Sequence, residues 1–370
     1  MSDKPKLAMI STDIRRDLVS PIEYFTKLEV IHFYQNAPYF DLYPSDFKGN
    51  LVRYRTMLDL CNKIKKCGPT IIQGSEPYGF PKTFQACAAS YLMSKILDVP
   101  MFFPMLENRP PQMKYGTISP FLMAYLKIYA QWAKLIFCLN EGAKRNLLNI
   151  GIDEGKLKKR MWGTWGVDVE EFTPEKDGKE PALGRFLLFV GRLDESKGIR
   201  YLLPAFKRVK EKIRDVNLVL IGDGPLREEI LQFSKQDILK GSISLFGILK
   251  NRDLPPYFRA ASLTVTPSIT TRKWEEQIGM VNIQSMACGT PVVSTLSGAI
   301  PEFVKDEETG LLVLERDSDE LAGAIIRLLT DDDLRIKLGK NARKHAVDNL
   351  DAKKNVEANE KIILSLLGEI

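Results

Sequence analysis

Residues 186–212 read FLLFVGRLDESKGIRYLLPAFKRVKEK. The apolar run at the start predicts a buried strand, and the spacing of apolar residues from Ile199 to Lys212 predicts a helix. The polar loop VGRLDESKG therefore leads from the carboxyl end of a strand into a helix. Units of this kind build a parallel sheet covered by helices, whose ligands bind at such loops.

The same alternation of apolar runs and helical patterns occurs along the rest of the chain. In the first half we expect strands at 6–12, 28–34, 70–75, 99–106 and 135–140, and helices at Leu51–Lys65 and Thr83–Leu97. The second half continues with the runs NLVLIGDG, SISLFG, LTVTPS, PVVST and GLLVL. Between the halves, residues 162–183 are rich in glycine, proline and charge, which is typical of a domain boundary.

We therefore expect an α/β protein with two doubly wound, Rossmann-like domains in series. The first domain would take residues 1–165 and the second residues 166–350. The pattern from Leu334 onward is mostly helical, and we expect residues 351–370 to form a crossover helix that packs back on the first domain.

The bulk composition excludes several classes of protein. With 44% hydrophobic and 27% charged residues, the chain resembles an ordinary globular protein, and its apolar runs are too short to span a bilayer. The start lacks the apolar core of a signal peptide, so we expect a cytoplasmic location, with the cytoplasmic membrane face as an open alternative. Five cysteines without CxxC spacing and two histidines disfavour a disulfide framework and a metal site.

Positive charge is concentrated in the first half of the chain. Residues 1–165 hold 23 Lys+Arg against 14 Asp+Glu, with clusters at 63–66 and 156–160. These clusters are either solvated helix faces or a surface for an anionic membrane or a phosphorylated acceptor. Because they lack interleaved aromatic residues, we expect no binding of nucleic acid.

Two cations lie in the loop at 190–198. Arg192 and Lys197 follow Gly191 at the end of the strand, and together they can neutralise the charge of a diphosphate. A surface pair of cations is the alternative interpretation.

A second loop, further along the chain, carries complementary groups. Residues 274–294 read WEEQIGMVNIQSMACGTPVVS, with Glu276 in the loop and a helix starting at Met280 and Val281. Unpaired amides at a helix start bind anions, and Gly279 lets the backbone turn there. Gln284 lies inside this mostly apolar helix, so a buried amide there needs a partner, which a ribose or sugar hydroxyl could supply.

Two glycines follow other strands of the second half. Gly222 lies in IGDGPLR at 221–227, and Gly247 lies in FGILK at 246–250. The missing side chain of Gly247 would let a flat base approach the backbone between Phe246 and Leu249. The alternative for Phe246 and Ile248 is that they belong to the core.

In this order and spacing, the four segments resemble the second domain of retaining glycosyltransferases of family 4, the glycosyl transferases group 1, which have the GT-B fold. Two further stretches are similar to motifs of that family, WGVDVEEFTP at 165–174 and SGAIPEFVKDEETGLLV at 297–313. The resemblance implies two Rossmann-like domains that face a cleft. It is strong from Phe186 to His345 and weaker before that range.

The resemblance also implies roles for the donor-side residues. Arg192 and Lys197 would hold the donor diphosphate, and Glu276 would contact the hydroxyls of the transferred sugar. The remaining donor-binding candidates are Gly191, Gly222, Phe246, Gly247, Ile248, Leu249, Gly279, Met280, Val281 and Gln284. The family has E-x7-E where this chain has E-x7-Q, so the ribose would meet the neutral amide of Gln284. An amide gives a weaker hydrogen bond than a carboxylate.

The first domain departs further from the family. It lacks the glycine pair after the first strand and a histidine near the end of the fourth. Residues at its strand ends are the acceptor-side candidates, with loop stabilisation as an equal alternative: Asp13, Arg15, Arg16, Glu76, Glu107, Asn108 and Arg109.

The implied activity is transfer of a hexosyl group from a nucleotide sugar to a hydroxyl of a lipid-linked or saccharide acceptor, with retention of configuration. A UDP-sugar is the first expectation for the donor. We expect no metal and no other cofactor, because the cations and helix-start amides would neutralise the leaving group. The acidic run at 331–333 is interpreted as a helix cap. Two alternatives stay open: a catalytically weak nucleotide-sugar-binding partner subunit, and a sugar-nucleotide epimerase.

Overall fold

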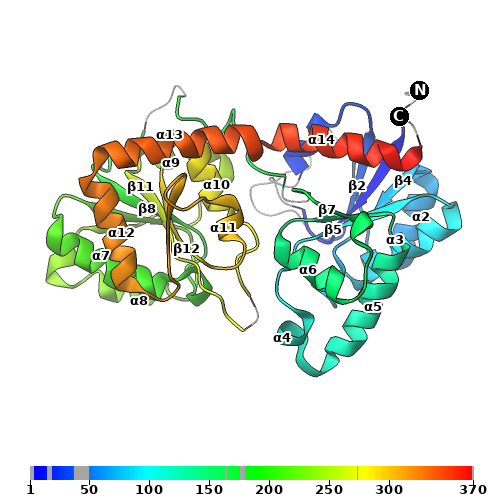
Figure 1. Ribbon diagram of the computed structural model, residues 1–370, viewed down its shortest axis with the longest axis horizontal. Helices are drawn as coiled ribbons and strands as arrows, with labels where there is room; N and C mark the ends of the chain where they lie inside the picture. Colours follow the sequence, from blue (N-terminus) through cyan, green and yellow to red (C-terminus); the bar gives the residue numbers. More distant parts are fainter. Residues whose placement is uncertain are drawn as a thin grey trace. The chain divides into compact units, whose positions relative to one another are not determined.

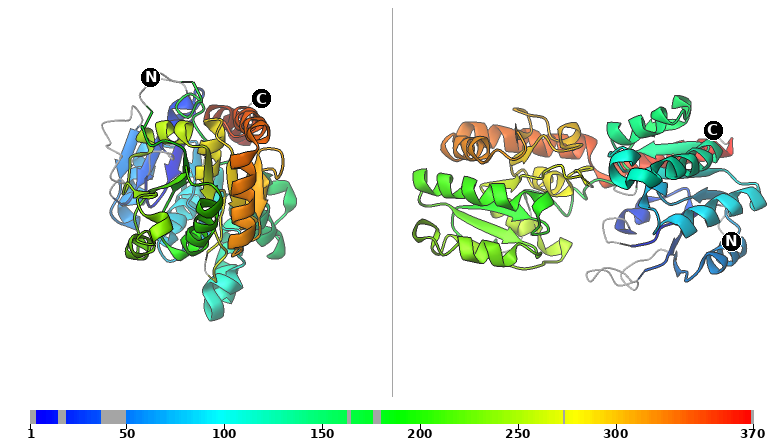
Figure 2. Two further views of the ribbon diagram at one scale, coloured as in Figure 1. Left: turned by 90° about the vertical axis from the view of Figure 1, so that its left-hand side faces the viewer. Right: turned by 90° about the horizontal axis from the view of Figure 1, so that it is seen from below.

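The computed structural model describes residues 4–14, 19–36, 50–162, 165–175, 180–272 and 274–368. The chain divides into two compact units. One unit combines Met1–Gly166 with Ala352–Ile370, and the other is Val167–Asp351. Each has a parallel sheet at its centre, with helices on both faces (Figures 1 and 2). This is the doubly wound α/β architecture that the sequence predicted.

The sheet of the first unit has the strand order β3-β2-β1-β4-β5-β6-β7 over the described residues. Adjacent strands all pair in parallel, and the central strands are buried along most of their length. Such burial on both faces explains why these strands are continuous apolar runs in the sequence. The strands are β1 Lys6–Ile10, β2 Glu29–Tyr34, β3 Asn50–Arg53, β4 Ile71–Gln73, β5 Met101–Met105, β6 Leu135–Cys138 and β7 Leu157–Lys159.

Two apolar cores cover the two faces of this sheet. One core contains side chains of α2, α3, α5 and α6, and the other contains side chains of η1 and α14. Short elements connect the larger ones. The elements are η1 Ser20–Tyr24, α2 Met57–Cys67, η3 Pro77–Gly79, α3 Phe84–Leu97, α4 Pro111–Tyr115, η4 Gly116–Ile118, α5 Ser119–Trp132, α6 Glu141–Asn149 and η5 Glu154–Lys156.

The expected helix Leu51–Lys65 is wrong at its start. Residues Asn50–Arg53 form β3, an edge strand that pairs with β2. The helix begins only at Met57, because the Thr56 side chain accepts a hydrogen bond from the amide of Asp59 and caps it. Apolar spacing alone did not reveal this boundary, since Leu51 and Val52 fit either structure.

The basic cluster at 156–160 is not a helix face either. Lys158 and Lys159 lie in β7, the strand at the opposite edge of the sheet. The ammonium of Lys159 pairs with Glu141 at 2.9 Å, and in the other cluster Lys63 pairs with Asp59 at 2.9 Å. Part of the charge in both clusters is therefore neutralised within the protein.

The helix near the end of the chain packs on the first unit, as expected. This helix is α14, Ala352–Leu364, followed by η9, Ser365–Leu367. Its Glu360 is 3% exposed, and the carboxylate accepts hydrogen bonds from the amides of Lys27 at 2.7 Å and Leu28 at 2.8 Å. A buried carboxylate with these partners fixes α14 against the segment that leads into β2.

The second unit has the strand order β10-β9-β8-β11-β12-β13, again with parallel pairs throughout. Helices α7, α8 and α12 contribute to the core on one face. On the other face, α10 contacts α9 and α13. The strands are β8 Phe186–Val190, β9 Asn217–Ile221, β10 Ile243–Leu245, β11 Leu263–Thr266, β12 Val292–Thr295 and β13 Gly310–Val313.

The helices of the second unit agree closely with the sequence pattern. Helix α7 has the predicted bounds, Ile199–Lys212. The acidic run at 331–333 is a cap as interpreted, because Asp331 accepts a hydrogen bond from the amide of Leu334. The other elements are η6 Glu195–Lys197, α8 Arg227–Phe233, η7 Asp237–Leu239, η8 Asn251–Asp253, α9 Pro255–Ala260, α10 Met280–Ala287, α11 Ile300–Phe303, α12 Ser318–Thr330 and α13 Asp332–Asn349.

Among the described ranges, no helix combines the length and the apolar character needed to cross a bilayer. All five cysteines are free thiols, and Cys87, Cys138 and Cys288 are buried.

Candidate functional site

The strand order of the second unit reverses between β8 and β11. From β8 the chain builds outward through β9 and β10, and it then returns to add β11, β12 and β13 on the other side. Open α/β sheets bind ligands at the carboxyl ends of the strands beside such a reversal, which is where the loops after β8 and β11 lie. Of the predicted donor-side residues, five lie on these two loops: Gly191, Arg192, Lys197, Glu276 and Gly279. The others lie in α10 or follow β9 and β10.

The loop after β8 has a fixed shape. The side chain of Asp194 accepts hydrogen bonds from Ser196 at 2.7 Å, from the amide of Lys197 at 3.2 Å, and from the guanidinium of Arg192. Burial alone would raise the pKa of Asp194, but the bonds from Ser196 and Arg192 hold it below its usual range. Asp194 therefore stays ionised and positions both predicted cations.

The loop after β8 is also tied to the loop after β11. The amide of Ile269 donates to the carbonyl of Ser196 at 2.8 Å. Gly198 has a φ of +70°, and a Cβ on it would collide with the carbonyl oxygen of Pro267. A residue with a side chain at position 198 would force the two loops apart.

The structure brings Lys197 and Glu276 into direct contact. The ammonium of Lys197 lies 2.7 Å from the carboxylate of Glu276 and 4.3 Å from the ring centre of Trp274. Glu276 also accepts a hydrogen bond from the Ser268 hydroxyl at 3.1 Å. The side chains of Lys197 and Glu276 are 26% and 12% exposed, so the pair is reachable from solvent. Two residues predicted from separate motifs thus form one polar centre.

Arg192 is the more open of the two cations. Its side chain is 78% exposed, and its guanidinium pairs with the carboxylate of Asp194. An exposed guanidinium beside an anchored loop can turn toward an anion without breaking the fold, which suits a group that meets a ligand.

The start of α10 faces the same loops. Gly279 precedes the helix with a φ of +73°, and the first-turn amides of Met280 and Val281 have no acceptor within the helix. Asn282, 1% exposed, accepts a hydrogen bond from Thr266 and donates to Ser294 at 3.3 Å. Because Thr266 and Ser294 belong to β11 and β12, this buried network fixes the helix start against the strand ends.

Gln284 lies one turn further into α10 and is 6% exposed. Its side-chain amide makes no hydrogen bond with the described residues, and its polar atoms are not among the fully buried atoms that lack a partner. Solvent therefore reaches the amide, and its contact with a ribose stays a prediction.

The loops after β9 and β10 continue this edge of the sheet. Gly191 donates to Ile221 at 2.9 Å, and Gly222 donates to Gly247 at 2.6 Å. A Cβ on Gly222 would collide with the carbonyl oxygen of Gly191, so glycine is required for the loops to lie this close. Three of the four glycines predicted for donor binding, Gly191, Gly222 and Gly247, therefore lie next to one another along this edge of the sheet.

Phe246 and Ile248 flank Gly247 on this edge. They are 39% and 60% exposed, so the alternative that they are core residues is wrong. Phe246 makes an edge contact with Tyr257 at a centroid distance of 5.6 Å. Leu249 is half-buried beside them.

In the first unit, the acceptor-side candidates gather at the ends of β4 and β5. One carboxylate oxygen of Glu76 accepts hydrogen bonds from the amides of Leu106 at 2.7 Å and Glu107 at 2.8 Å. Burial raises the pKa of Glu76 to about 7. The loop-stabilising alternative thus accounts for Glu76, and contact with an acceptor stays a prediction.

Glu107, Asn108 and Arg109 form the loop that Glu76 holds. Glu107 is 5% exposed, pairs with Lys114, and accepts the amide of Arg109 at 3.1 Å. The side chain of Asn146 donates to the carbonyls of Glu107 and Arg109, each at 3.0 Å. These residues are fixed in position before any ligand binds.

The remaining candidates follow β1. Asp13 is exposed, and its carboxylate accepts a hydrogen bond from Asn36 at 2.6 Å. Arg15 and Arg16 lie outside the described residues.

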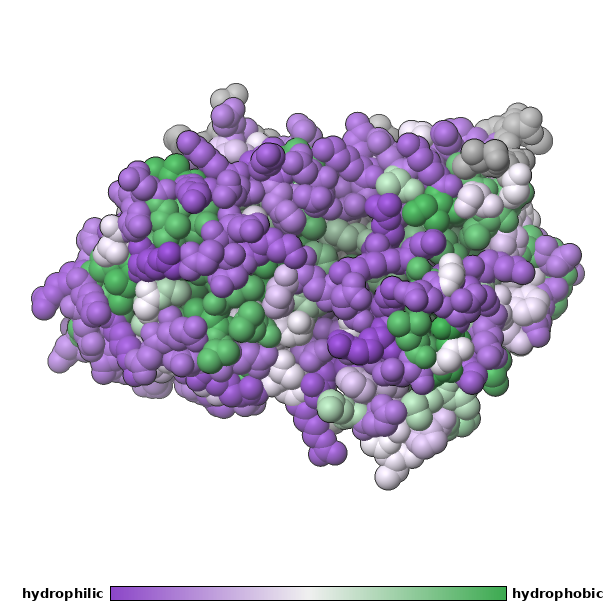
Figure 3. Space-filling model, in the orientation of Figure 1, coloured by the Kyte–Doolittle hydropathy of each residue, from purple (hydrophilic) through white to green (hydrophobic). Residues whose placement is uncertain are grey.

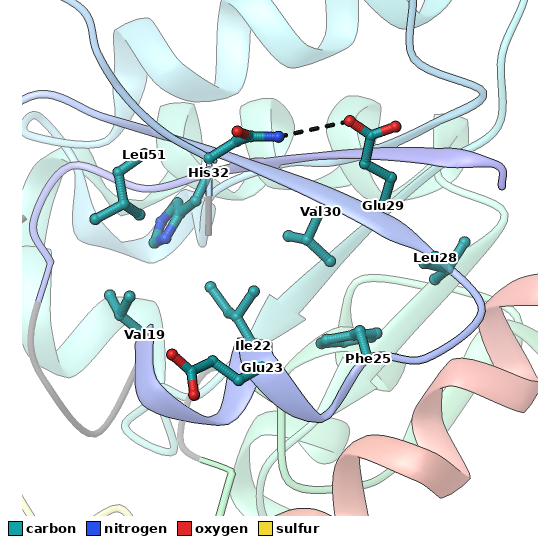
Figure 4. A pocket seen from close by; sticks show the side chains of 10 residues that line it. Val19, Ile22, Glu23, Phe25, Leu28, Glu29, Val30, His32 and Leu51 are labelled. Carbon is teal, nitrogen blue, oxygen red and sulfur yellow. Dashed lines mark hydrogen bonds between the residues drawn. The ribbon is translucent and has the colours of Figure 1, made fainter. Parts of the chain in front are cut away.

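A cavity of about 400 Å³ occupies a different part of the first unit, between η1, strand β2 and the edge strand β3 (Figure 4). His32 lines it, with Nε2 2.8 Å from the Ser11 hydroxyl and Nδ1 without a hydrogen-bond partner among the described residues. Burial lowers the pKa of His32 to about 3, so the ring is neutral. No residue predicted for the site lines this cavity.

Residues 172–345 match the family profile described as glycosyl transferases group 1, so nearly all of the second unit is similar to this family. The resemblance inferred from the motifs is confirmed.

Several relatives with similar sequences are glycosyltransferases. An uncharacterized glycosyltransferase of Methanocaldococcus jannaschii is 28% identical over 66% of this chain and 64% of its own length. A D-inositol 3-phosphate glycosyltransferase of Corynebacterium jeikeium is 32% identical over 49% of this chain and 46% of its own length. The matches thus span about half to two thirds of the lengths of these relatives.

Solved structures establish the fold over nearly the whole chain. The structure of Anabaena HepE in complex with UDP and glucose superposes with a TM-score of 0.77 at 16% identity, covering 98% of this chain and all of that one. The fold is therefore GT-B, as expected.

Several residues of the site were missed by the sequence reasoning. No role was predicted for Trp274, although its ring lies against the Lys197 ammonium. Asn282 was missed as well, although a polar residue in a helix otherwise read as apolar was a usable signal. Ser268 gave no signal, because a serine after a strand is common in any loop.

Proposed function

We propose that the protein transfers a hexosyl group from a nucleotide sugar to a hydroxyl of a lipid-linked or saccharide acceptor, with retention of anomeric configuration. The observation that carries the proposal is the contact of Lys197 with Glu276 at 2.7 Å, on two loops that flank the reversal of strand order. A cation for phosphate and a carboxylate for sugar hydroxyls lie side by side there, as a sugar diphosphate requires.

In the proposed reaction, the bond between the sugar C1 and the diphosphate oxygen breaks while the acceptor oxygen bonds to C1. Arg192, Lys197 and the amides of Met280 and Val281 would stabilise the charge that develops on the leaving diphosphate. The acceptor proton would pass to the departing phosphate, so no histidine base is required.

Glu276 would hold the sugar hydroxyls in this scheme, and Gln284 would meet the ribose. Lys197 and Glu276 lie 2.7 Å apart, so a donor whose phosphate reaches Lys197 would bring its sugar to Glu276. This arrangement favours a ligand that has both a phosphate and a sugar. Neither phosphate alone nor free sugar satisfies both groups.

The protein would need no metal, because two cations and the helix-start amides supply the positive charge that a divalent ion supplies elsewhere. Turnover should therefore persist in excess EDTA.

UDP-sugars are the first donors to test. The structurally similar Anabaena HepE is described in complex with UDP and glucose, and the similar corynebacterial enzyme is named for D-inositol 3-phosphate. A phosphorylated or lipid-linked acceptor agrees with the excess of positive charge in residues 1–165.

The test is incubation of the full chain with labelled UDP-, GDP- and ADP-sugars and a lipid extract. We expect release of the nucleoside diphosphate and transfer of label to an acceptor with the anomeric configuration of the donor. Inversion would refute the retaining assignment, and an altered sugar still attached to its nucleotide would indicate the epimerase.

A nucleotide-sugar-binding partner subunit is the second candidate. Gln284 favours it, because a neutral amide replaces the glutamate of the family motif at a position that is 6% exposed. Donor binding in calorimetry without hydrolysis or transfer would support the subunit and contradict the enzyme.

A further inference from the structure

Helices α3 and α5 expose apolar side chains on their solvent sides. On α5 these are Phe121, Ile128 and Trp132, which are 64%, 59% and 39% exposed. On α3 they are Phe84, Leu92 and Ile96, which are 41%, 40% and 59% exposed. We call these six residues the α3–α5 apolar face.

The α3–α5 apolar face is continuous across the two helices. Tyr91 of α3 contacts Trp132 of α5 at a centroid distance of 5.8 Å, and Phe84 contacts Tyr125 at 5.6 Å. Phe80, before α3, contacts Phe121 at 6.5 Å. Aromatic rings thus bridge the groove between the helices. The lower tip of the first unit, over α4 and α5, is white to light green in Figure 3.

The charges around this face are positive. Helices α3, α4 and α5 contain lysines and no acidic residue. Lys82, Lys95, Lys127 and Lys134 are exposed, and none forms an ion pair with the described residues. The acids of residues 82–134 are Asp98, at the end of α3, and Glu107, which is buried beside Lys114.

Lys95 connects the charge to the aromatic rings. Its ammonium lies 4.5 Å from the ring centre of Tyr91 and 4.7 Å from that of Trp132. The indole of Trp132 donates to the Ser94 hydroxyl at 3.0 Å. Tryptophan, tyrosine and lysine with an apolar surface beside them match the boundary between lipid headgroups and acyl chains.

We propose that the α3–α5 apolar face is a docking surface for an anionic lipid bilayer. Phe121, Ile128 and Trp132 enter the acyl boundary, while Lys95 and Lys127 contact anionic headgroups. A second copy of the chain fits less well, because a symmetric contact would place the lysines of one copy against those of the other. The surface differs from the two basic clusters expected from the sequence, and docking does not depend on the donor or on the transfer reaction.

Vesicle flotation of the full chain tests the proposal. We expect flotation with vesicles of phosphatidylcholine and phosphatidylglycerol in equal parts, but not with phosphatidylcholine alone. Added salt should weaken the association. Lys95→Gln with Lys127→Gln should weaken binding about twenty-five-fold, about fivefold for each lysine. Phe121→Ser with Ile128→Ser should weaken it at least about tenfold.

The matched control lies on α13 of the second unit. Ile336 is 51% exposed there, next to the exposed Lys337. Ile336→Ser with Lys337→Gln removes the same kinds of group and should leave flotation unchanged. Because Lys95 and Lys127 are exposed, their variant keeps the test valid even if the apolar variant fails to fold.

Quenching by brominated lipid locates the contact. We expect part of the tryptophan emission to be quenched, and the quenching to disappear in Trp132→Phe but persist in Trp274→Phe. The proposal is overturned by an absence of flotation with both vesicles, by equal binding of the lysine variant and the wild type, or by a dimer that the apolar variant dissociates. Nucleotide release from the donor, measured without vesicles, is unaffected by the lysine variant, the Phe121/Ile128 variant and Trp132→Phe, so failure of docking and failure of the proposed enzyme can be distinguished.

Discussion

Replacing Lys197 by methionine tests the donor site most directly. Methionine keeps an unbranched stem of similar length and removes the ammonium that lies 2.7 Å from Glu276 and 4.3 Å from the Trp274 ring centre. The stem can still cover Trp274, so the packing of the loop is largely retained. The change therefore isolates the charge.

The expected effect on turnover is large. Loss of one preorganised group that stabilises a developing charge costs about 3–4 kcal/mol, which is about 10²–10³ in kcat. The expected effect on folding is small, about 1 kcal/mol or less, because the pair is partly exposed and Glu276 keeps its bond from Ser268 at 3.1 Å. Turnover should thus fall while the thermal midpoint changes by a few degrees.

Release of UDP from a UDP-sugar measures the first quantity, and thermal unfolding followed by circular dichroism measures the second. Lys212→Met is the matched control, because Lys212 is an exposed lysine at the far end of α7. It should leave both quantities unchanged. Wild-type turnover in Lys197→Met, or an equal loss in Lys212→Met, would refute the assignment of charge to the leaving group.

Three further predictions concern other positions. Gln284→Glu should tighten nucleotide binding about fivefold if the side chain meets ribose, since charged hydrogen bonds are stronger. Calorimetry measures the affinity, with Gln232→Glu on α8 as the control that should leave it unchanged. Weaker nucleotide binding by Gln284→Glu would contradict the contact with ribose. Gly198→Ala should lower the free energy of unfolding by at least about 2 kcal/mol, because φ is +70° there. Gly323→Ala in α12, where nothing lies near an added Cβ, should leave stability equal or higher in the same melts. Glu76 should make stability fall as pH rises from about 4.5 to about 7, because its pKa is raised to about 7 in the folded chain and the unfolded chain releases the proton first. The full change is about 3 kcal/mol. Glu76→Gln should flatten this slope in melts across that range, and an unchanged slope would show that another group causes it.

The doubly wound fold and the position of the site could be predicted because they depend on local patterns. A buried parallel strand must be apolar along its length, and a strand that leads into a helix must place the loop at the carboxyl end of the sheet. The bounds of α7 and the cap at Asp331 followed from residues within one turn.

Edge strands were harder to predict, since their residues are half-exposed. In β3 the apolar Leu51 and Val52 continue into a helix pattern, and in β7 two of three residues are lysines. Neither has the apolar run of a central strand, so only pairing with a neighbour identifies them.

Contacts between distant residues could not be read from the sequence. The partner of Lys197 is 79 positions away, and the carboxylate of Glu76 is used by a loop 30 positions away. The sequence indicated which groups carry charge. Which of them neutralise one another depends on the strand order, which brings the loops together.

The first unit is interrupted in the chain, with its last helix encoded after the whole of the second unit. Trp162 and Trp165 pack in one apolar core with Val356 and Ile363 of α14. One side of this core therefore stays uncovered until α14 has been synthesised. On the ribosome, the second unit can complete its core while the first still waits for α14. Truncation before Ala352 should therefore damage the unit made first, and leave the unit made last able to fold.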